Sequence, residues 1–413
     1  MSITITPRVL SGRVTVPPSK SMAHRLLICA GLSDGVSTIK NIALSEDIKA
    51  TLSALKAYGR TADFDGNTCR IGGAISAPAK SVMDCNESGS TLRFFVPIVS
   101  ALGGGQMTGS ERLLQRPLSV YQESFEKNGK AFKQTKPLTV PKGLHGGHFE
   151  AKGNISSQFI SGVMLAAPLL DVDTHIVLTT PLESKGYVDM TIQAMAMFGV
   201  TVQVLEPDSE YLIGKNEKYQ ATEAVTEGDW SQSGFWALAG LASPEGIDIG
   251  GLDHSTHQGD RGIIDILKRM GVDAETKSGL FVKKTALLGA EIDISQVPDL
   301  APVVAGLMAV SGKPGRMTGC GRLRIKESDR MESIASTLNN LGASAVIEGD
   351  TLLIQGKPKG GFVKTFNDHR IAMMAAALSA FCEKEVTIED ETVVNKSYPD
   401  FWQDFTALGG SDV

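Results

Sequence analysis

The chain has 413 residues and a formal net charge of −6, with 42% hydrophobic and 21% charged residues. This length exceeds one ordinary hydrophobic core and predicts two domains. The acidic balance excludes a nucleic-acid or anionic-membrane surface that depends on overall charge. We expect a soluble, cytoplasmic protein, because the N-terminus (MSITITPRVL) lacks the pattern of a signal peptide and the longest apolar runs are too short to span a membrane.

The cysteines and histidines do not predict a metal site. Five cysteines, at positions 29, 69, 85, 320 and 382, include no CxxC pair, and we expect no disulfides. HGGH at 145–148 and HSTH at 254–257 come with no cysteine or acidic partner in a recognisable zinc pattern, so we expect loops there. No bound metal is predicted.

The first predicted helix has an unusually cationic start. The stretch VPPSKSMAHR at 16–25 places two prolines before it, and these end the preceding segment because proline fixes φ and donates no backbone hydrogen bond. Lys20 and Arg25 then lie at a helix start, where free N–H groups and the helix dipole favour anions. Either this start binds an anion, or it is a serine cap flanked by solvated basic residues.

Helices of this kind recur along the chain, each with a polar start followed by an apolar run rich in small residues. Their starts are 68, 68, 74, 68 and 70 positions apart by subtraction, and this regularity indicates an internal repeat. Because the runs are apolar on nearly all sides, we expect them to be buried. The six segments are SKSMAHRLLICAGL from 19, ESGSTLRFFVPIVSAL from 87, ISSQFISGVMLAAPLL from 155, DWSQSGFWALAGL from 229, VPDLAPVVAGLMAV from 297 and NDHRIAMMAAALSAF from 367.

A second, more amphipathic helix is predicted after each of these segments, and several of them end at glycine, as in SEDIKATLSALKAYG at 45–59. Short β-type stretches lie between the helices. Examples are HIVLTT at 175–180 and ASAVIEGDTLLIQG at 343–356, the latter with a Gly-Asp turn signal. Each unit therefore reads as β-α-β-α followed by a hairpin.

Six units divide most simply into two similar α/β domains of three units each. The polar stretch TEGDW at 226–230 precedes the fourth buried helix and marks the crossover. We therefore predict one domain at 19–227 and a second at 1–18 plus 228–413. Placing residues 1–18 in the second domain supposes that the first strand, within residues 3–16, pairs with the C-terminal half.

Cationic residues gather at the starts of the predicted helices. If the helix starts of each domain point the same way, these side chains converge in an interdomain cleft, which we predict to be the active site and to bind a polyanion. They are Lys20, Arg25, Arg93, Arg116, Lys185, Lys326, Arg330, Arg370 and Lys396.

Eight motifs, over about residues 12–406, resemble in their order those of the 5-enolpyruvylshikimate-3-phosphate synthase family. They are SKSMAHR, ESGSTLR, QRP at 115–117, SSQF, PD at 298–299, IKESDR, NDHR and NKSYPDF. The resemblance implies two similar domains, each an inside-out α/β barrel of three β-α-β-α-β-β repeats that closes over the substrates. It implies a monomer, without metal or organic cofactor, that acts in the shikimate pathway towards chorismate and the aromatic amino acids.

The implied reaction transfers the carboxyvinyl group of phosphoenolpyruvate to the 5-hydroxyl of shikimate 3-phosphate and releases phosphate. Cations must first offset two phosphates and two carboxylates. A base must then take the 5-hydroxyl proton as the oxygen attacks C2. An acid must protonate C3, and the methyl so formed must lose a proton when phosphate leaves.

The resemblance also implies a role for individual residues. Asp299 would accept the 5-hydroxyl proton, while Glu327 and Lys20 would act at C3. Shikimate 3-phosphate would be bound by Lys20, Ser21, Arg25, Ser156, Ser157, Gln158, Ser184, Asp299 and Lys326. Phosphoenolpyruvate would be bound by Lys20, Gly89, Arg116, Gln158, Arg330, Arg370 and Lys396.

Several of these residues have a structural alternative. Asp299 could cap a helix that starts at Pro298. The pairs Glu327–Arg330 and Lys326–Asp329 are spaced three apart, as in surface ion pairs on a helix. Arg93 could anchor its loop, and His369 reads as an orienting group rather than a base.

The chain departs from the family pattern at two places. CNESGSTLR stands where the family usually has Asn-Ser-Gly-Thr or Asn-Ala-Gly-Thr, so either Glu87 replaces the asparagine or Asn86 serves with one residue inserted. Arg322 stands where many members have an asparagine that contacts the shikimate phosphate.

Two other functions remain open from the sequence. The sister enzyme that acts on UDP-N-acetylglucosamine usually carries a reactive cysteine before its Arg-Pro motif, and the loop GSERLLQRP has none. A non-catalytic anion-binding homologue would have no need of carboxylates such as Asp299 and Glu327 facing its ligand.

Overall fold

Apolar helices form at each of the six predicted positions. Five begin at a side chain that accepts a hydrogen bond from a backbone N–H in the first turn, and such caps stabilise a helix start; these caps are Ser19, Ser88, Ser156, Asp229 and Asp368. The sixth continues from a 3-10 turn, η3 (Pro298–Leu300). The helices are α1 (Lys20–Leu32), α3 (Gly89–Ala101), α6 (Ser157–Ala166), α8 (Trp230–Gly240), α10 (Ala301–Ser311) and α12 (His369–Ser379).

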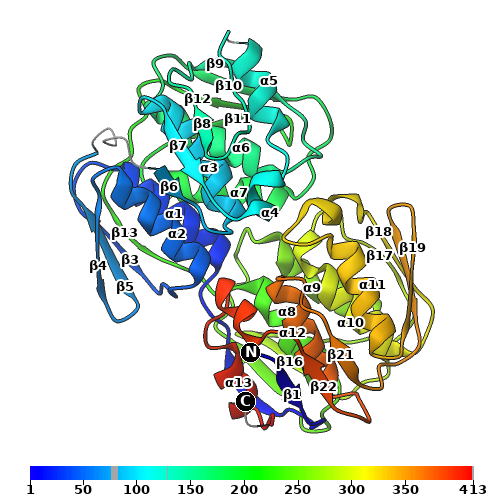
Figure 1. Ribbon diagram of the computed structural model, residues 1–413. Helices are drawn as coiled ribbons and strands as arrows, with labels where there is room; N and C mark the ends of the chain where they lie inside the picture. Colours follow the sequence, from blue (N-terminus) through cyan, green and yellow to red (C-terminus); the bar gives the residue numbers. More distant parts are fainter. Residues whose placement is uncertain (76–81, 128, 412–413) are drawn as a thin grey trace. The chain divides into compact units, whose positions relative to one another are not determined.

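The computed structural model describes residues 1–75, 82–127 and 129–411, which fall into two units with separate cores (Figure 1). The first unit is Pro18–Thr226, and the second is Met1–Pro17 with Glu227–Val413. The chain thus passes between the units twice, and each passage is one residue from the predicted boundary.

The first unit surrounds its buried helices with three sheets in the described residues, in the orders β13-β3-β5-β4, β6-β7-β8 and β11-β12-β10-β9. The strands are β3 (Ser37–Lys40), β4 (Thr61–Asp65), β5 (Thr68–Gly72), β6 (Val82–Asp84), β7 (Gly105–Thr108), β8 (Leu138–Val140), β9 (Gly147–Ala151), β10 (Thr174–Leu178), β11 (Val202–Glu206), β12 (Glu210–Ile213) and β13 (Glu223–Val225). The remaining helices are α2 (Glu46–Ala57), α4 (Glu111–Gln115), α5 (Ser119–Lys127), η1 (Ala167–Leu169) and α7 (Lys185–Met197).

The second unit repeats this design with sheets in the orders β1-β22-β21, β15-β16-β14-β2 and β17-β18-β20-β19 among the described residues. The strands are β1 (Ile3–Ile5), β2 (Gly12–Thr15), β14 (Ile247–Gly250), β15 (Glu275–Thr276), β16 (Gly279–Val282), β17 (Glu291–Asp293), β18 (Gly315–Thr318), β19 (Ser344–Glu348), β20 (Thr351–Gln355), β21 (Gly361–Val363) and β22 (Val386–Ile388). The remaining helices are η2 (Gly259–Gly262), α9 (Ile263–Arg269), η4 (Gly321–Ile325), α11 (Arg330–Asn340), η5 (Glu391–Lys396) and α13 (Phe401–Ala407).

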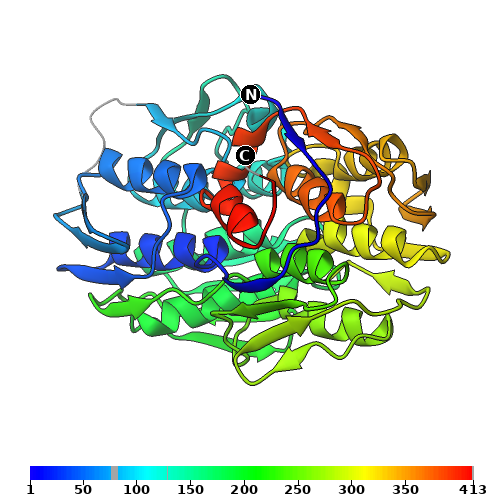
Figure 2. The same cartoon turned by 90° about the horizontal axis from the view of Figure 1, so that it is seen from below.

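The N-terminal strands belong to the second unit. β1 pairs antiparallel with β22, and β2 pairs parallel with β14. Figure 2 shows the dark blue N-terminal segment beside the orange strands of the C-terminal part. The predicted pairing of the first strand with the C-terminal half is therefore confirmed.

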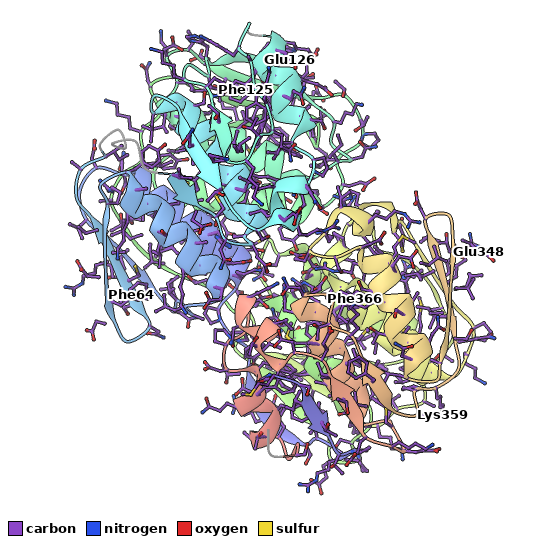
Figure 3. All side chains as sticks on the ribbon, viewed as in Figure 1. Phe64, Phe125, Glu126, Glu348, Lys359 and Phe366 are labelled. Atoms are coloured by element: carbon purple, nitrogen blue, oxygen red, sulfur yellow. The ribbon has the colours of Figure 1, made fainter. Side chains whose placement is uncertain are left out.

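Each unit has its helices inside and its sheets outside, the inside-out arrangement that the resemblance implied. Small residues make the close helix packing possible: a Cβ on Gly162 of α6 would lie 2.7 Å from the carbonyl oxygen of Arg93 in α3. The sheets alternate buried and exposed residues, so that Ala345 of β19 is buried while Glu348 projects into solvent (Figure 3).

Two expectations about histidines and membranes are addressed by the fold. HGGH is not a loop throughout, because β9 begins at Gly147 and pairs His148 with His175 of β10. In the part of the chain that the structure describes, no helix is long and apolar enough to cross a membrane.

Candidate active site

In the first unit, the cationic start of α1 forms an ion pair with α2. Lys20 is the first residue of α1, and its Nζ lies 2.6 Å from Oδ2 of Asp47 in the first turn of α2. Each side chain is only 13% exposed. The sequence reasoning missed Asp47, although the acidic start SEDIK was a signal for it, because an acidic first turn already has an ordinary explanation in the helix dipole.

Arg25 lies one turn deeper and is almost fully buried. Its guanidinium donates to the carbonyl oxygens of Ser21 (2.7 Å) and Tyr187 (2.9 Å) and to Oγ1 of Thr191 (2.7 Å). Burial lowers the pKa of Arg25 to about 10, so it remains charged at neutral pH. Arg25 therefore links α1 to α7 by hydrogen bonds.

The start of α3 lies against Arg116, which follows α4. A Cβ on Gly89 would lie 2.5 Å from Nη1 of Arg116, so the absence of a side chain lets the guanidinium reach the helix start. Arg93, one turn along α3, donates to Oε1 of Gln158 at 2.7 Å and to the carbonyl oxygen of Pro117 at 3.3 Å. Arg93 thus anchors its loop, as one alternative supposed, and it also orients Gln158.

The predicted serines lie at the starts of α6 and α7. Ser156 caps α6, and Ser157 is buried as the first residue of that helix. Ser184 precedes α7 with φ of 57° and is 2% exposed. Lys185, predicted to face the polyanion, is half exposed and pairs with Asp208.

In the second unit, Asp299 contacts three cations. Its Oδ1 lies 3.1 Å from Nζ of Lys326 and 3.1 Å from Nη1 of Arg330, and its Oδ2 lies 3.1 Å from Nη2 of Arg370. Burial alone would raise the pKa of Asp299, but the charges of Arg370, Lys326 and Arg330 hold it well below its ordinary value. Asp299 is therefore ionised at neutral pH.

Arg330 is fully buried and contacts two further carboxylates. Its Nε lies 2.9 Å from Oδ2 of Asp368, and its Nη2 lies 2.5 Å from Oε2 of Glu327. Burial would lower the pKa of Arg330, but Asp368, Glu327 and Asp299 raise it above its ordinary value. Asp368 is a further residue that the sequence reasoning missed, because its position reads as an ordinary helix cap.

Of the structural alternatives for this cluster, only the ion pair between Glu327 and Arg330 forms. Val297, not Asp299, is the residue that precedes η3, and Asp299 lies in the first turn. The Glu327–Arg330 pair is not a surface pair, because Arg330 has no exposed side-chain area. Lys326 pairs with Asp299 rather than with Asp329, which instead caps α11.

Two unusual residues shape the start of α12. Phe366, labelled in Figure 3, and Asn367 have φ of 52° and 56°, a conformation that non-glycine residues rarely adopt. Nζ of Lys396 donates to the carbonyl oxygen of Asn367 at 2.6 Å, which ties η5 to this turn. His369 and Arg370 then begin α12 as buried residues.

The structure shows the surroundings of both positions at which the sequence departs from the family pattern. Asn86 has φ of 50° and its carbonyl accepts from the backbone N–H of Ser110, so Asn86 forms the turn before Glu87 and the cap of α3. Nη2 of Arg322 donates to the carbonyl oxygen of Ser295 at 2.5 Å.

Among the described residues, no group of three or more His, Cys, Asp or Glu side chains is arranged to hold a metal.

Gly89→Ala tests the contact between α3 and Arg116. The new Cβ would displace the guanidinium end of the buried Arg116 side chain and no backbone atom, so we expect a loss in the free energy of unfolding on the order of 1 kcal/mol. Because Arg116 is a predicted phosphoenolpyruvate ligand, we expect the KM for that substrate to rise about tenfold. Steady-state kinetics and urea unfolding check both values. Gly214→Ala is the control, since its Cβ would have no neighbour closer than 3.9 Å; equal KM values in the two variants would contradict the prediction.

Comparisons with known proteins agree with this fold. The sequence model of the family described as EPSP synthase (3-phosphoshikimate 1-carboxyvinyltransferase) matches residues 5–405. Proteins named 3-phosphoshikimate 1-carboxyvinyltransferase from Clostridium kluyveri and Clostridium novyi are 45% and 42% identical, over 99% of this chain and 97% and 98% of theirs. The solved EPSP synthase from Acinetobacter baumannii has a TM-score of 0.82 at 24% identity over 99% of this chain and 98% of that chain.

The fold is that of the enolpyruvyl transferases, and it is also similar to the solved transferase NikO from Streptomyces tendae (TM-score 0.80, 17% identity, over 99% of this chain and 97% of that chain). The chain belongs to the EPSP synthase family. It is a 3-phosphoshikimate 1-carboxyvinyltransferase of the shikimate pathway, and the UDP-N-acetylglucosamine alternative is not favoured.

Proposed function

We propose that the site residues described in the two units bind the two substrates of this reaction. Shikimate 3-phosphate is held by Lys20, Ser21, Arg25, Ser156, Ser157, Gln158, Ser184, Asp299 and Lys326. Phosphoenolpyruvate is held by Lys20, Gly89, Arg116, Gln158, Arg330, Arg370 and Lys396. The charges support this division, because these cations would offset the phosphates and carboxylates that the substrates bring together.

In the addition step, the 5-hydroxyl oxygen forms a bond to C2 of phosphoenolpyruvate while Asp299 takes the hydroxyl proton. Lys20 or Glu327 donates a proton to C3, so that the methylene becomes a methyl group. In the elimination step, the C2–O bond to phosphate breaks, the methyl loses one proton to the same group, and the vinyl double bond forms again. The proton that Asp299 took from the hydroxyl passes to the departing phosphate, so Asp299 is ionised again and phosphate leaves as the only other product.

One observation supports this proposal most strongly: Asp299 lies 3.1 Å from each of three cations that are themselves predicted substrate ligands. Without substrate, its carboxylate partly neutralises them. When an anionic substrate shares Lys326, Arg330 and Arg370, their hold on Asp299 weakens and its basicity rises. Binding would thereby prepare the proton acceptor for the addition step.

The test is phosphate release from the purified protein, with EDTA present, beside Lys20→Met. We expect release only when both substrates are present, and we expect it to fall at least a hundredfold in the variant, because general acid catalysis alone typically contributes that much. Lys49→Met, an exposed lysine of α2, is the control and should release phosphate as the unchanged protein does. Binding of shikimate 3-phosphate without any phosphate release would contradict the proposal and favour a non-catalytic homologue.

A further inference from the structure

A chain of fully buried hydrogen bonds connects three helix starts in the first unit. His24 of α1, Thr51 of α2, Thr91 of α3 and Ser88, the cap of α3, have no exposed side-chain area. Nδ1 of His24 lies 2.7 Å from Oγ1 of Thr51, which lies 2.7 Å from Oγ1 of Thr91. Oγ1 of Thr91 donates to Oγ of Ser88 at 2.8 Å.

The hydroxyl directions leave one consistent arrangement of protons. Because Thr91 donates its hydroxyl proton to Ser88, its oxygen must accept from Thr51, and Thr51 must then accept from Nδ1–H of His24. Burial, with the charges of Lys20 and Arg25, lowers the pKa of His24 well below its ordinary value. The ring is therefore neutral and in one tautomer.

This chain of hydrogen bonds lies one helical turn after the Lys20–Asp47 ion pair of the candidate site. His24 is four residues after Lys20 on α1, and Thr51 is four residues after Asp47 on α2, so both pairs lie one turn apart on the same helix face. The Lys20–Asp47 contact and the His24–Thr51 contact are thus successive links between the same two helices. Thr91 and Ser88 extend the second link to the helix start where Gly89 lies against Arg116.

A hydrogen bond of this kind limits sliding between helices more than an apolar contact does. Its length and angle are narrowly defined, whereas apolar packing is non-directional and tolerates small shifts. Breaking one link would also leave buried donors or acceptors unpaired, which costs free energy. Buried hydrogen-bond networks therefore favour one relative arrangement of the elements that they join. Here the links run unbroken from Nδ1 of His24 to Ser88, while Nε2 of His24 has no partner among the described residues.

We propose that His24, Thr51, Thr91 and Ser88 form a positioning network that holds Lys20 of α1 at a fixed distance from the Gly89 start of α3, and so shapes the phosphoenolpyruvate-binding part of the site. The inference rests on the proposed roles of Lys20 and Gly89. The network itself contacts no substrate. It acts through the positions of the helix starts.

Thr51→Val tests the network, since it removes one hydroxyl at nearly constant shape. We expect the KM for phosphoenolpyruvate to rise about tenfold, because small misplacements of binding groups are costly. The KM for shikimate 3-phosphate should rise less, because Lys20 is only one of its proposed ligands and Gly89 is not among them. A purely structural role would lower the amount of folded enzyme, and hence kcat, without changing either KM. Thr51→Ser keeps the hydroxyl and should restore the KM.

Thr174→Val is the matched control, because Thr174 is a buried threonine of the same unit whose hydroxyl has no partner among the described residues. Its KM values should equal those of the unchanged protein. An unchanged KM for phosphoenolpyruvate in Thr51→Val, or an equal rise in Thr174→Val, would overturn the inference. If Thr51→Val does not fold, Thr51→Cys replaces it, since a thiol forms only weak hydrogen bonds, and the same KM comparison decides. No phosphate release by the unchanged protein would instead refute the proposed function.

Discussion

Asp299→Asn is expected to lower kcat about a thousandfold while the KM for phosphoenolpyruvate stays the same or falls. The kcat value falls because asparagine cannot accept the 5-hydroxyl proton, and general base catalysis typically contributes about 10²–10⁴. The KM does not rise, because the change removes a negative charge that competes with the anionic substrate for Lys326, Arg330 and Arg370. Steady-state kinetics with each substrate varied in turn separates the two effects.

The variant should still fold, because Arg330 keeps its contacts with Asp368 and Glu327. Asp293→Asn, an exposed aspartate in β17 of the same unit, is the control and should keep both values. A kcat of Asp299→Asn within tenfold of the unchanged protein would show that another group accepts the proton. A large rise in KM would show that Asp299 orients the cations rather than competing for them.

The repeat made the fold predictable from the sequence. Small apolar residues recur at a period that only a repeated buried helix explains, and the helices α1, α3, α6, α8, α10 and α12 lie where that period predicts. Sheet membership could not be predicted in the same way. β13 pairs in parallel with β3, more than 180 residues earlier in the chain, and three-residue strands such as β13 carry no local signal of their partner.

The candidate site was predictable where a charge had no ordinary structural explanation. Lys20 at a helix start is unfavourable for the dipole, so it indicated function. Asp47 and Asp368 were missed for the opposite reason, because an acidic residue at a helix start is the expected stabilising choice. Sequence spacing also suggested the wrong partner for Lys326 in one of the alternatives. Asp329 is near in sequence, but the fold places Asp299 at 3.1 Å from Lys326.

Asp260 in η2 is a buried carboxyl whose titration should control the stability of the second unit. It is 4% exposed, and its Oδ1 has no hydrogen-bond partner in the described part of the chain. Burial and the nearby charge of Asp299 raise the pKa of Asp260 from 3.8 to about 7, although Arg370 opposes this. The folded chain therefore holds this proton more tightly than the unfolded chain does.

The sign of the effect follows from that difference. At pH below about 4, both states carry the proton and Asp260 has no effect. As the pH rises from about 4 to 7, the unfolded state loses the proton first, so the free energy of unfolding falls. Between pH 5 and pH 8, the loss should be on the order of 3 kcal/mol.

Asp260→Asn removes this titration, so the stability of the variant relative to the unchanged protein should increase by about that amount between pH 5 and pH 8. Urea unfolding followed by tryptophan fluorescence measures the stability of the second unit, because Trp230, Trp236 and Trp402 all lie there. Asp265→Asn, an exposed aspartate of α9, should show no such pH-dependent gain. A gain that is equal at both pH values would mean that Asp260 is already ionised at pH 5, and that Arg370 outweighs both its burial and the charge of Asp299.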